Sequence, residues 1–251
     1  MKTHILICLI ILSALIQSRV VFCREAIRIG ASPYPISTFE ENGEVVGLDF
    51  DIVEAILKEA GIHSTTRVLK PWKRILNDLD IGNVDMVVPM VFTKEREKTY
   101  NLTPSIRPRY NIVLVNKGFR HPINTIFDLK GLIVGKCDGY AYQTEFLEAA
   151  DNNLFETSYC LDNKMGLQKL KAGRSQALMI GEDAACYLIK TLGFKNVFEF
   201  TAYKAEKASH VGINKSDTDL YDIFLKGFKR AKENGAIERI IKQWKTDYAI
   251  R

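Results

Sequence analysis

The chain has 251 residues, 47% of them hydrophobic and 26% charged, which is an ordinary globular composition. This length allows one large domain or two domains of about 100 residues each. The formal net charge of +5 is small and dispersed along the chain, so it gives no reason to expect nucleic acid as a partner.

Residues 1–23 differ in character from everything that follows. Lys2 precedes an almost wholly apolar run at residues 5–16, and a polar break follows at residues 17–19. The run is shorter than the roughly 20 residues that a bilayer-spanning helix needs. The pattern therefore predicts a secretory signal peptide over residues 1–23, and hence an exported, periplasmic protein. An uncleaved N-terminal anchor is the alternative.

Strand and helix signals alternate over the next stretch of chain. Apolar residues at helical spacing predict a helix at residues 50–60, with Asp49 as its N-cap. Pro71 begins a second helix, which ends near Gly82. The strands are expected at residues 26–30, 65–69 and 85–88, and Pro89 argues against a central strand that continues further. This order predicts a parallel sheet flanked by helices.

A second α/β unit follows a strand at residues 110–115. Its expected elements are strands at 132–135, 155–160, 176–180 and 197–201, and helices at 140–150, from Asp162 to near Gly173, and at 183–191. A short strand at 210–213 and helices at 220–233 and 236–244 close the chain. Two crossings of the chain, near 112–116 and 207–213, predict two lobes with a ligand cleft between them. We expect one lobe to comprise residues 24–112 and 210–251, and the other residues 113–209.

Cysteine and histidine spacing gives no sign of a metal or cofactor site. Cys137, Cys160 and Cys186 are widely spaced without a Cys-x-x-Cys pair, so neither zinc nor another metal or cofactor is expected. One disulfide is compatible with an oxidising compartment, but the spacing does not choose the pair. The histidines are isolated, and the common hydrolase and nucleotide-binding motifs are missing from the sequence.

Five short segments stand out by their order and spacing. They are residues 47–53 (GLDFDIV), 82–85 (GNVD), 93–96 (TKER), 128–131 (DLKG) and 134–139 (VGKCDG). Together they resemble the type II periplasmic solute-binding proteins of the amino-acid class, family 3, and the resemblance covers about residues 24–248. It implies two lobes, each a mostly parallel sheet flanked by helices, joined by a hinge of two strands. It also implies a binding protein, not an enzyme, that delivers a small carboxylate-bearing solute, an amino acid or a relative of one, to an inner-membrane ABC transporter.

The resemblance further implies where the solute binds. The family's arginine in the T-x-E-R segment clamps the carboxylate of the solute, which points to Arg96 here. An aromatic residue in the first loop packs on the solute, which fits Tyr34, and Trp72 lies near another usual contact. The candidate ligand-binding residues are Arg96, Tyr34, Trp72, Thr93, Val91, Tyr140 and Glu182.

The sequence also departs from the pattern of amino-acid binders. The loop before T-x-E-R usually offers small or hydroxyl residues to an α-ammonium group, whereas residues 89–91 are Pro, Met and Val. Where an aspartate often follows the later strand, Gly181 stands, and Glu182 or Asp183 would have to substitute. A carboxylate-bearing solute is therefore better supported than an α-amino acid. Arg74, Arg107 and Arg109 are expected to be solvated.

Two other readings of the same fold remain open from the sequence. One is an enzyme similar to the cyclohexadienyl dehydratases, in which an acid in the cleft, such as Glu182, would donate a proton. The other is a stand-alone sensor input that signals to a membrane protein instead of feeding a permease. For the solute-binding protein, as for these two alternatives, we expect a monomer.

Overall fold

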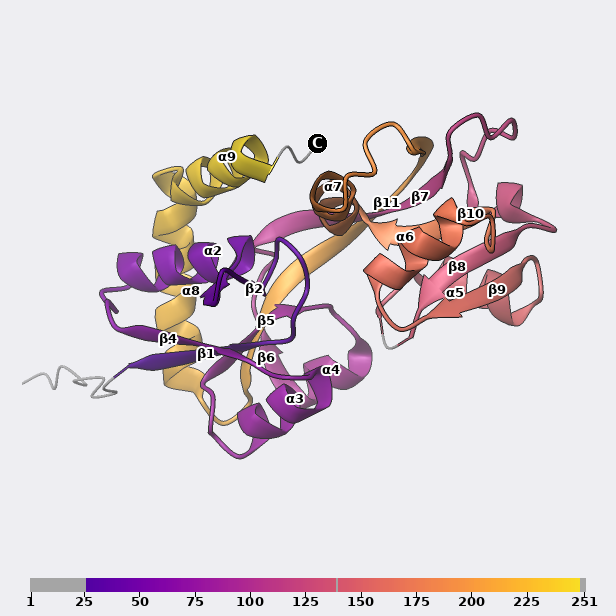
Figure 1. Cartoon of the computed structure of the whole chain (residues 1–251). Helices are drawn as coiled ribbons and strands as arrows, with labels where there is room; N and C mark the ends of the chain where they lie inside the picture. Colours follow the sequence, from indigo (N-terminus) through magenta and orange to yellow (C-terminus); the bar gives the residue numbers. More distant parts are fainter. Residues whose placement is uncertain (1–25, 139, 249–251) are drawn as a thin grey trace, which may run out of the picture.

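Two lobes make up the computed structural model, which describes residues 26–138 and 140–248. Figure 1 shows them on either side of two long strands, β7 (Arg107–Asn116) and β11 (Phe198–Asn214). The predicted two-lobed α/β fold is thereby confirmed. We propose that the first lobe comprises residues 24–112 and 210–251, and that the second lobe comprises residues 113–209. The predicted signal peptide lies outside the described residues.

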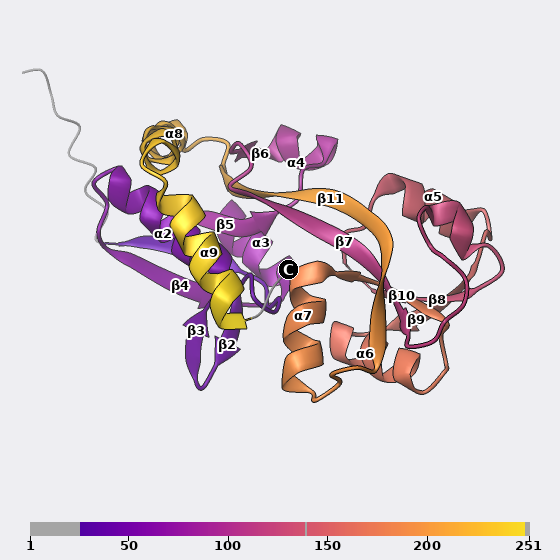
Figure 2. The same ribbon diagram turned by 90° about the horizontal axis from the view of Figure 1, so that it is seen from above.

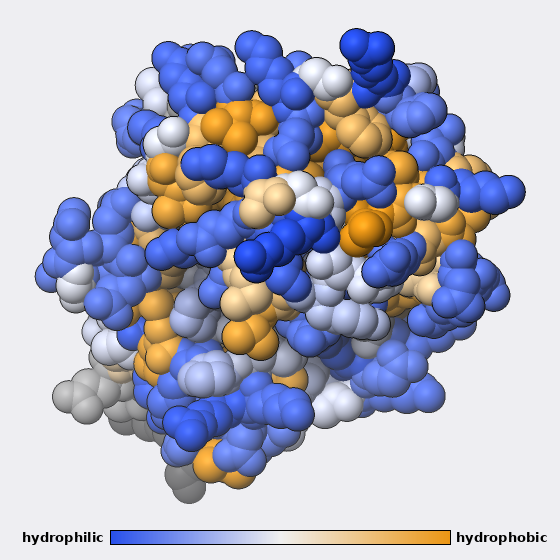
Figure 3. Space-filling model, turned by 45° about the vertical axis from the view of Figure 1, so that its right-hand side comes forward, coloured by the Kyte–Doolittle hydropathy of each residue, from blue (hydrophilic) through white to orange (hydrophobic). Residues whose placement is uncertain are grey.

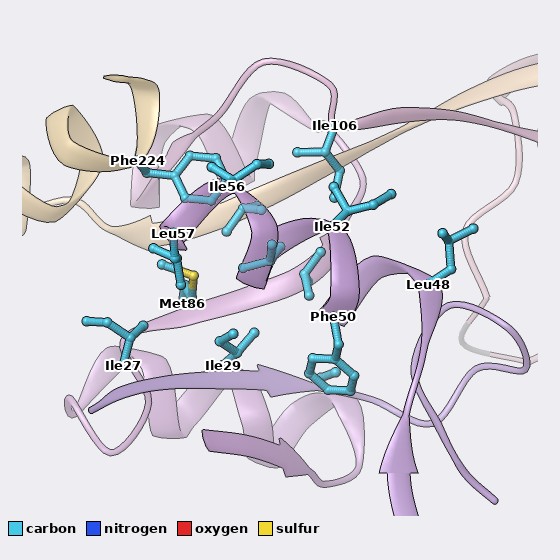
Figure 4. Packing of buried hydrophobic residues seen from close by; sticks show 14 of the residues in the cluster. Ile27, Ile29, Leu48, Phe50, Ile52, Ile56, Leu57, Met86, Ile106 and Phe224 are labelled. Carbon is cyan, nitrogen blue, oxygen red and sulfur yellow. The ribbon is translucent and has the colours of Figure 1, made fainter. Parts of the chain in front are cut away.

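The first lobe is built on a parallel sheet with helices on both faces. Its strands run in the order β4 (Thr65–Leu69), β1 (Ile27–Ala31) and β5 (Met86–Met90), followed by the end of β11 and by β6 (Tyr100–Leu102), both antiparallel to their neighbours. Apolar residues of α2 (Leu48–Glu59), α8 (Thr218–Glu233) and α9 (Ala236–Tyr248) cover one face. In Figure 4, Ile52 and Ile56 of α2 and Phe224 of α8 pack over this sheet. The opposite face is covered by α3 (Trp72–Asp80).

The second lobe repeats this plan. Its parallel strands are β10 (Ala177–Gly181), β8 (Ile133–Cys137) and β9 (Glu156–Cys160), and β10 pairs antiparallel with β7. One face packs against the 3-10 helix η1 (Ile126–Leu129) and α5 (Thr144–Asp151), and the other against α6 (Asn163–Lys171) and α7 (Glu182–Thr191). Two smaller features complete the first lobe, namely the hairpin of β2 (Phe39–Glu41) and β3 (Glu44–Val46), and the short helix α4 (Lys94–Thr99).

The hinge is one long pair of strands, interrupted by a shift of register between Phe200 and Lys204 of β11. Residues Arg107 to Asn116 of β7 pair with Ser209 to Phe198 of β11, and Figure 2 shows the two strands running side by side from lobe to lobe. The prediction of two short strands at 197–201 and 210–213 was wrong, because β11 is a single strand of 17 residues. Its middle alternates exposed and half-buried residues, and so lacks the apolar run by which a central strand is recognised.

Three local predictions were also wrong. β5 continues through Pro89, which is possible because the pairs with β1 end at Val87 and the pairing with β11 shifts register beside it. α5 begins at Thr144 and not at 140, since the preceding residues line the cavity described below. α2 begins at Leu48 with Gly47 as its N-cap, where a side chain would collide with the Ser37 carbonyl, so the predicted cap Asp49 lies inside the helix.

Among the residues that the structure describes, none of the helices combines the length and apolar character needed to cross a bilayer. Figure 3 shows one face of the molecule, on which hydrophilic side chains separate the hydrophobic ones into small patches. Isolated apolar side chains at a surface are normal in globular proteins.

Candidate functional site

A cavity of about 250 Å³ lies between the lobes and is lined by residues of both. The first lobe contributes the loop after β1, the start of α3, the end of β5 and α4, and the second contributes the segment after β8 and the end of β10. The hinge strands β7 and β11 form its remaining wall. Ligands of open α/β sheets bind at the carboxyl ends of such strands, and this volume suits a small solute.

Arg96 is held in this cavity by local contacts. Thr93 is the N-cap of α4, and its hydroxyl accepts a hydrogen bond from the Arg96 amide at 3.2 Å. The guanidinium lies 4.9 Å from the centre of the Trp72 ring and donates to the Val91 carbonyl at 2.8 Å. Burial lowers the pKa of Arg96, although an arginine stays charged at neutral pH. Within the described ranges Arg96 forms no ion pair, so its charge can meet an anion from outside.

Two further cations come from the hinge. Arg109 of β7 and Lys207 of β11 are paired directly across the two strands, and both line the cavity. The Arg109 guanidinium lies 4.7 Å from the centre of the Tyr34 ring, and the Lys207 ammonium donates to the Ala141 carbonyl at 2.8 Å. Like charges placed opposite each other destabilise a sheet. Burial first, and then the charges of Arg109 and Arg96, lower the pKa of Lys207 to about 7.

A buried ion network lies behind the cavity. The Arg107 guanidinium is bonded to Asp49 of α2 and, at 2.8 Å, to Asp183 of α7, and it donates to the Ser37 hydroxyl at 2.9 Å. Burial opposes the charge of Arg107, but the two carboxylates outweigh it and raise its pKa. The expectation that Arg107 and Arg109 are solvated was wrong, because both are buried. Arg74, by contrast, is exposed, as expected.

Aromatic residues of the two lobes meet at one side of the cavity. The rings of Tyr34 and Tyr140 have their centroids 5.7 Å apart. The Tyr34 hydroxyl occupies the space into which a side chain at position 181 would point, and a β-carbon there would collide with it. Gly181 is thus required by the close approach of Tyr34. Burial raises the pKa of Tyr34, which keeps its hydroxyl protonated at neutral pH.

The structure brings most of the candidate residues together around the cavity. Those that line it are Tyr34, Trp72, Val91, Arg96 and Tyr140. Thr93 lies outside the lining and positions Arg96 through the cap. Glu182 also lies outside the lining, because its carboxylate pairs with the Lys204 ammonium at 2.8 Å. Whether the lining residues touch the solute stays a prediction.

Sequence reasoning missed the hinge residues Arg109, Asn111 and Lys207. A signal for two of them was present, since Arg107, Arg109 and Asn111 stand at every second position ahead of an apolar run. Alternate residues of a strand share a face, and these three are buried. Among residues 26–138 and 140–248, no cluster of three or more histidine, cysteine or acidic side chains could hold a metal ion.

Comparison with known proteins gives a family match over most of the chain and several relatives. Residues 27–247 match the model of the bacterial extracellular solute-binding proteins, family 3. The chain is 25% identical over 213 residues to the L-cystine-binding protein TcyJ of Escherichia coli K12, covering 84% of this chain and 79% of the relative.

Solved structures share the fold. An ancestral arginine-binding protein bound to arginine superimposes with a TM-score of 0.74, at 24% identity, over 88% of this chain and 98% of its own. The sensor domain of a histidine kinase similar to periplasmic binding proteins gives a TM-score of 0.76, at 20% identity, over 88% and 96% of the two chains. Both predictions drawn from the five motifs, the family and the fold, are therefore confirmed.

Proposed function

Because this chain belongs to family 3 of the bacterial extracellular solute-binding proteins, we propose that it closes its two lobes on a small solute that carries a carboxylate. The observation that carries the proposal is Arg96, a half-buried guanidinium in the interlobe cavity whose hydrogen bond goes to a neutral carbonyl. A partly desolvated charge is costly unless an opposite charge meets it. A guanidinium also fits the two oxygens of a carboxylate.

The relatives support the solute class. The names of two of them state that they bind cystine and arginine, and both of these solutes carry a carboxylate. The remaining walls of the cavity supply aromatic faces from Tyr34, Trp72 and Tyr140, which suit the less polar part of a small solute.

Function in this proposal is a shift of population between open and closed lobes. The solute favours the closed form because only that form brings the wall of each lobe to it. In the described conformation Tyr34 of one lobe lies against Tyr140 and Gly181 of the other, which are contacts that closure would require. The solute-loaded protein would then deliver its cargo to an ABC permease at the inner membrane, acting as a monomer in the periplasm.

The two other readings of the fold receive less support. An enzyme of the dehydratase type was expected to use Glu182 as the acid, but Lys204 holds this carboxylate outside the cavity. The likeness to a kinase sensor domain is one of fold alone. We therefore expect binding without turnover.

Calorimetric titration of the purified mature chain with amino acids and organic acids tests this proposal, after a thermal-shift screen has found a binder. Arg96→Gln should weaken binding at least tenfold, because a charge-assisted hydrogen bond contributes about 1.5–3 kcal/mol. Arg74→Gln, which removes an exposed arginine of α3 outside the cavity, should bind like the parent. Equal affinity of the parent and Arg96→Gln would refute the role of this side chain.

A further inference from the structure

We propose that the solute is a small dicarboxylate without an α-ammonium group, bound at one end by Arg96 and at the other by Lys207 with Arg109. This inference rests on the proposed function of the same cavity and deepens it. It differs from the solutes named for the relatives, which are amino acids. Two features of the described residues carry it, namely the excess of positive charge around the cavity and the pairing of Glu182, the acid next to Gly181, with Lys204.

The charge around the cavity is unbalanced. Arg96, Arg109 and Lys207 line it, whereas Asp138 supplies the single acidic side chain of its described lining and is itself exposed. Arg109 is partly balanced by Asp183, whose pKa is lowered by Arg107 and Arg109 against the effect of burial. Arg96 and Lys207 have no such partner: in the described part of the chain each donates to a backbone carbonyl. Two cations therefore remain for the solute.

The two cations come from different parts of the wall. Arg96 lies at the first lobe, against Trp72, whereas Lys207 lies on the hinge and reaches the Ala141 carbonyl of the second lobe. A solute with an anionic group at each end can meet both of them at once. A solute with a single carboxylate leaves one of the two half-buried charges unpaired, which costs free energy.

Apart from the exposed Asp138, the described lining offers an α-ammonium group no acidic side chain. Gly181 has no side chain, and the Tyr34 hydroxyl fills the space beside it. Glu182 already holds an ammonium group, that of Lys204, through both carboxylate oxygens at 2.8 and 3.0 Å. Pro89 and Val91 replace the hydroxyl residues that an ammonium group could use at the other wall. The cationic lining would also repel it.

The protonation of Lys207 offers a second measurement of solute binding. Because its ammonium is costly in the empty cavity, it is partly deprotonated at neutral pH, and a bound anion should restore its proton. The other charged or titratable side chains around Lys207 are Arg96, Arg109, Asp138, Glu182, Asp183, Glu206, His210 and the hydroxyls of Tyr34, Tyr110, Tyr140 and Tyr142. A variant that lacks only Lys207 therefore separates the proton uptake of Lys207 from that of these other groups.

The test compares four small solutes in calorimetric titrations of the mature chain, and three of them, glutarate, glutamate and glutamine, share a five-carbon chain. Succinate and glutarate carry two carboxylates, glutamate adds an α-ammonium group to the second of these, and glutamine keeps only one carboxylate. We expect the better dicarboxylate to bind at least tenfold more tightly than glutamate and at least a hundredfold more tightly than glutamine. Lys207→Met should weaken dicarboxylate binding at least tenfold, whereas Lys136→Met, which removes a lysine lying over Tyr159, should not.

Titration in buffers of different ionisation heat measures the protons taken up. The parent chain should take up nearly one proton per dicarboxylate at pH 8, about one unit above the pKa of Lys207 in the empty cavity, and Lys207→Met should take up clearly fewer. Tighter binding of glutamine or glutamate than of either dicarboxylate would overturn this inference and leave the carboxylate-binding function standing. If no carboxylate binds, or if Arg96→Gln binds normally, the proposed function itself fails.

Discussion

Lys207 lies where its own charge is costly to the folded chain. Its pKa falls from an ordinary 10.5 to about 7, so between these values the unfolded chain holds more protons than the folded one. The free energy of unfolding of the solute-free protein should therefore rise with pH from about 7 towards 10.5. Below pH 7 both states are protonated, and the full cost of the buried charge remains.

Lys207→Met removes this cost. At pH 6 the variant should gain about 1 kcal/mol or more in the free energy of unfolding, or roughly 2–4 °C in Tm per kcal/mol for a chain of this size. Its stability should also rise less than that of the parent between pH 7 and pH 9. Urea unfolding at pH 6, 7 and 9 measures the free energy of unfolding of the parent and of the variant, with Lys136→Met as the control. Identical pH profiles in all three proteins would show that Lys207 is an ordinary solvated lysine.

Gly181 and Tyr34 form a matched pair at the contact between the lobes. A β-carbon at 181 would collide with the Tyr34 hydroxyl, so Gly181→Ala should cost about 1–3 kcal/mol through overpacking. Tyr34→Phe removes the colliding oxygen and leaves the ring carbon 3.3 Å from the added β-carbon. The double variant Gly181→Ala/Tyr34→Phe should regain most of the loss relative to Tyr34→Phe. Thermal unfolding of the four proteins decides this, and strictly additive losses would contradict the pairing.

At the scale of elements, β8 and β9 bring together two of the cysteines that spacing left unassigned. Cys137 and Cys160 are register partners on these parallel strands, both are buried, and their sulfur atoms lie 2.6 Å apart. In an oxidising compartment we predict a disulfide between them, formed as the two thiols pass two electrons and two protons to the oxidant of that compartment. Cys186 should stay a thiol.

Alkylation of the unfolded, unreduced mature chain measures the predicted disulfide. It should label Cys186 alone, and prior reduction should expose Cys137 and Cys160 and cost about 3 kcal/mol of stability. Cys186→Ser is the control, in which no cysteine is labelled before reduction. Labelling of Cys137 and Cys160 without reductant, in protein recovered from the exporting compartment, would contradict the pairing.

Most elements were predictable from the sequence because their local signals agree with the fold. Asp162, at which the sequence begins a helix, caps α6 through its side chain, and Asp217 caps α8 in the same way. The resemblance predicted the two-strand hinge, but local signals did not predict the continuous middle of β11, since it is stabilised by pairing with β7 and not by an apolar run of its own. The residues of the cavity also differ in how far the sequence identifies them. Arg96 stands in a sequence motif, whereas Arg109 and Lys207 lie together only because β7 and β11, distant in sequence, pair with each other.

At the scale of the whole molecule, Arg107 links three elements across the hinge. Its guanidinium joins Asp49 of α2 to Asp183 of α7, and in this network Arg107 and Asp49 are buried and Asp183 is half-buried. Arg107→Met would leave both carboxylates without their cation and should destabilise the chain by about 3–5 kcal/mol. Lys229→Met, which removes one partner of the exposed pair with Glu233, should cost less than about 1 kcal/mol. Urea unfolding compares the two, and similar losses would contradict the structural role of the network.

The central claim is that two lobes close on an anionic solute held by the guanidinium between them. The crystal structure of the mature chain with the tightest binder from the titrations tests it most directly. We predict a carboxylate of the solute in the interlobe cavity, with its oxygens about 2.7–2.9 Å from the Arg96 nitrogens. A solute bound elsewhere, or one in the cavity that leaves Arg96 facing bulk water, would contradict the account.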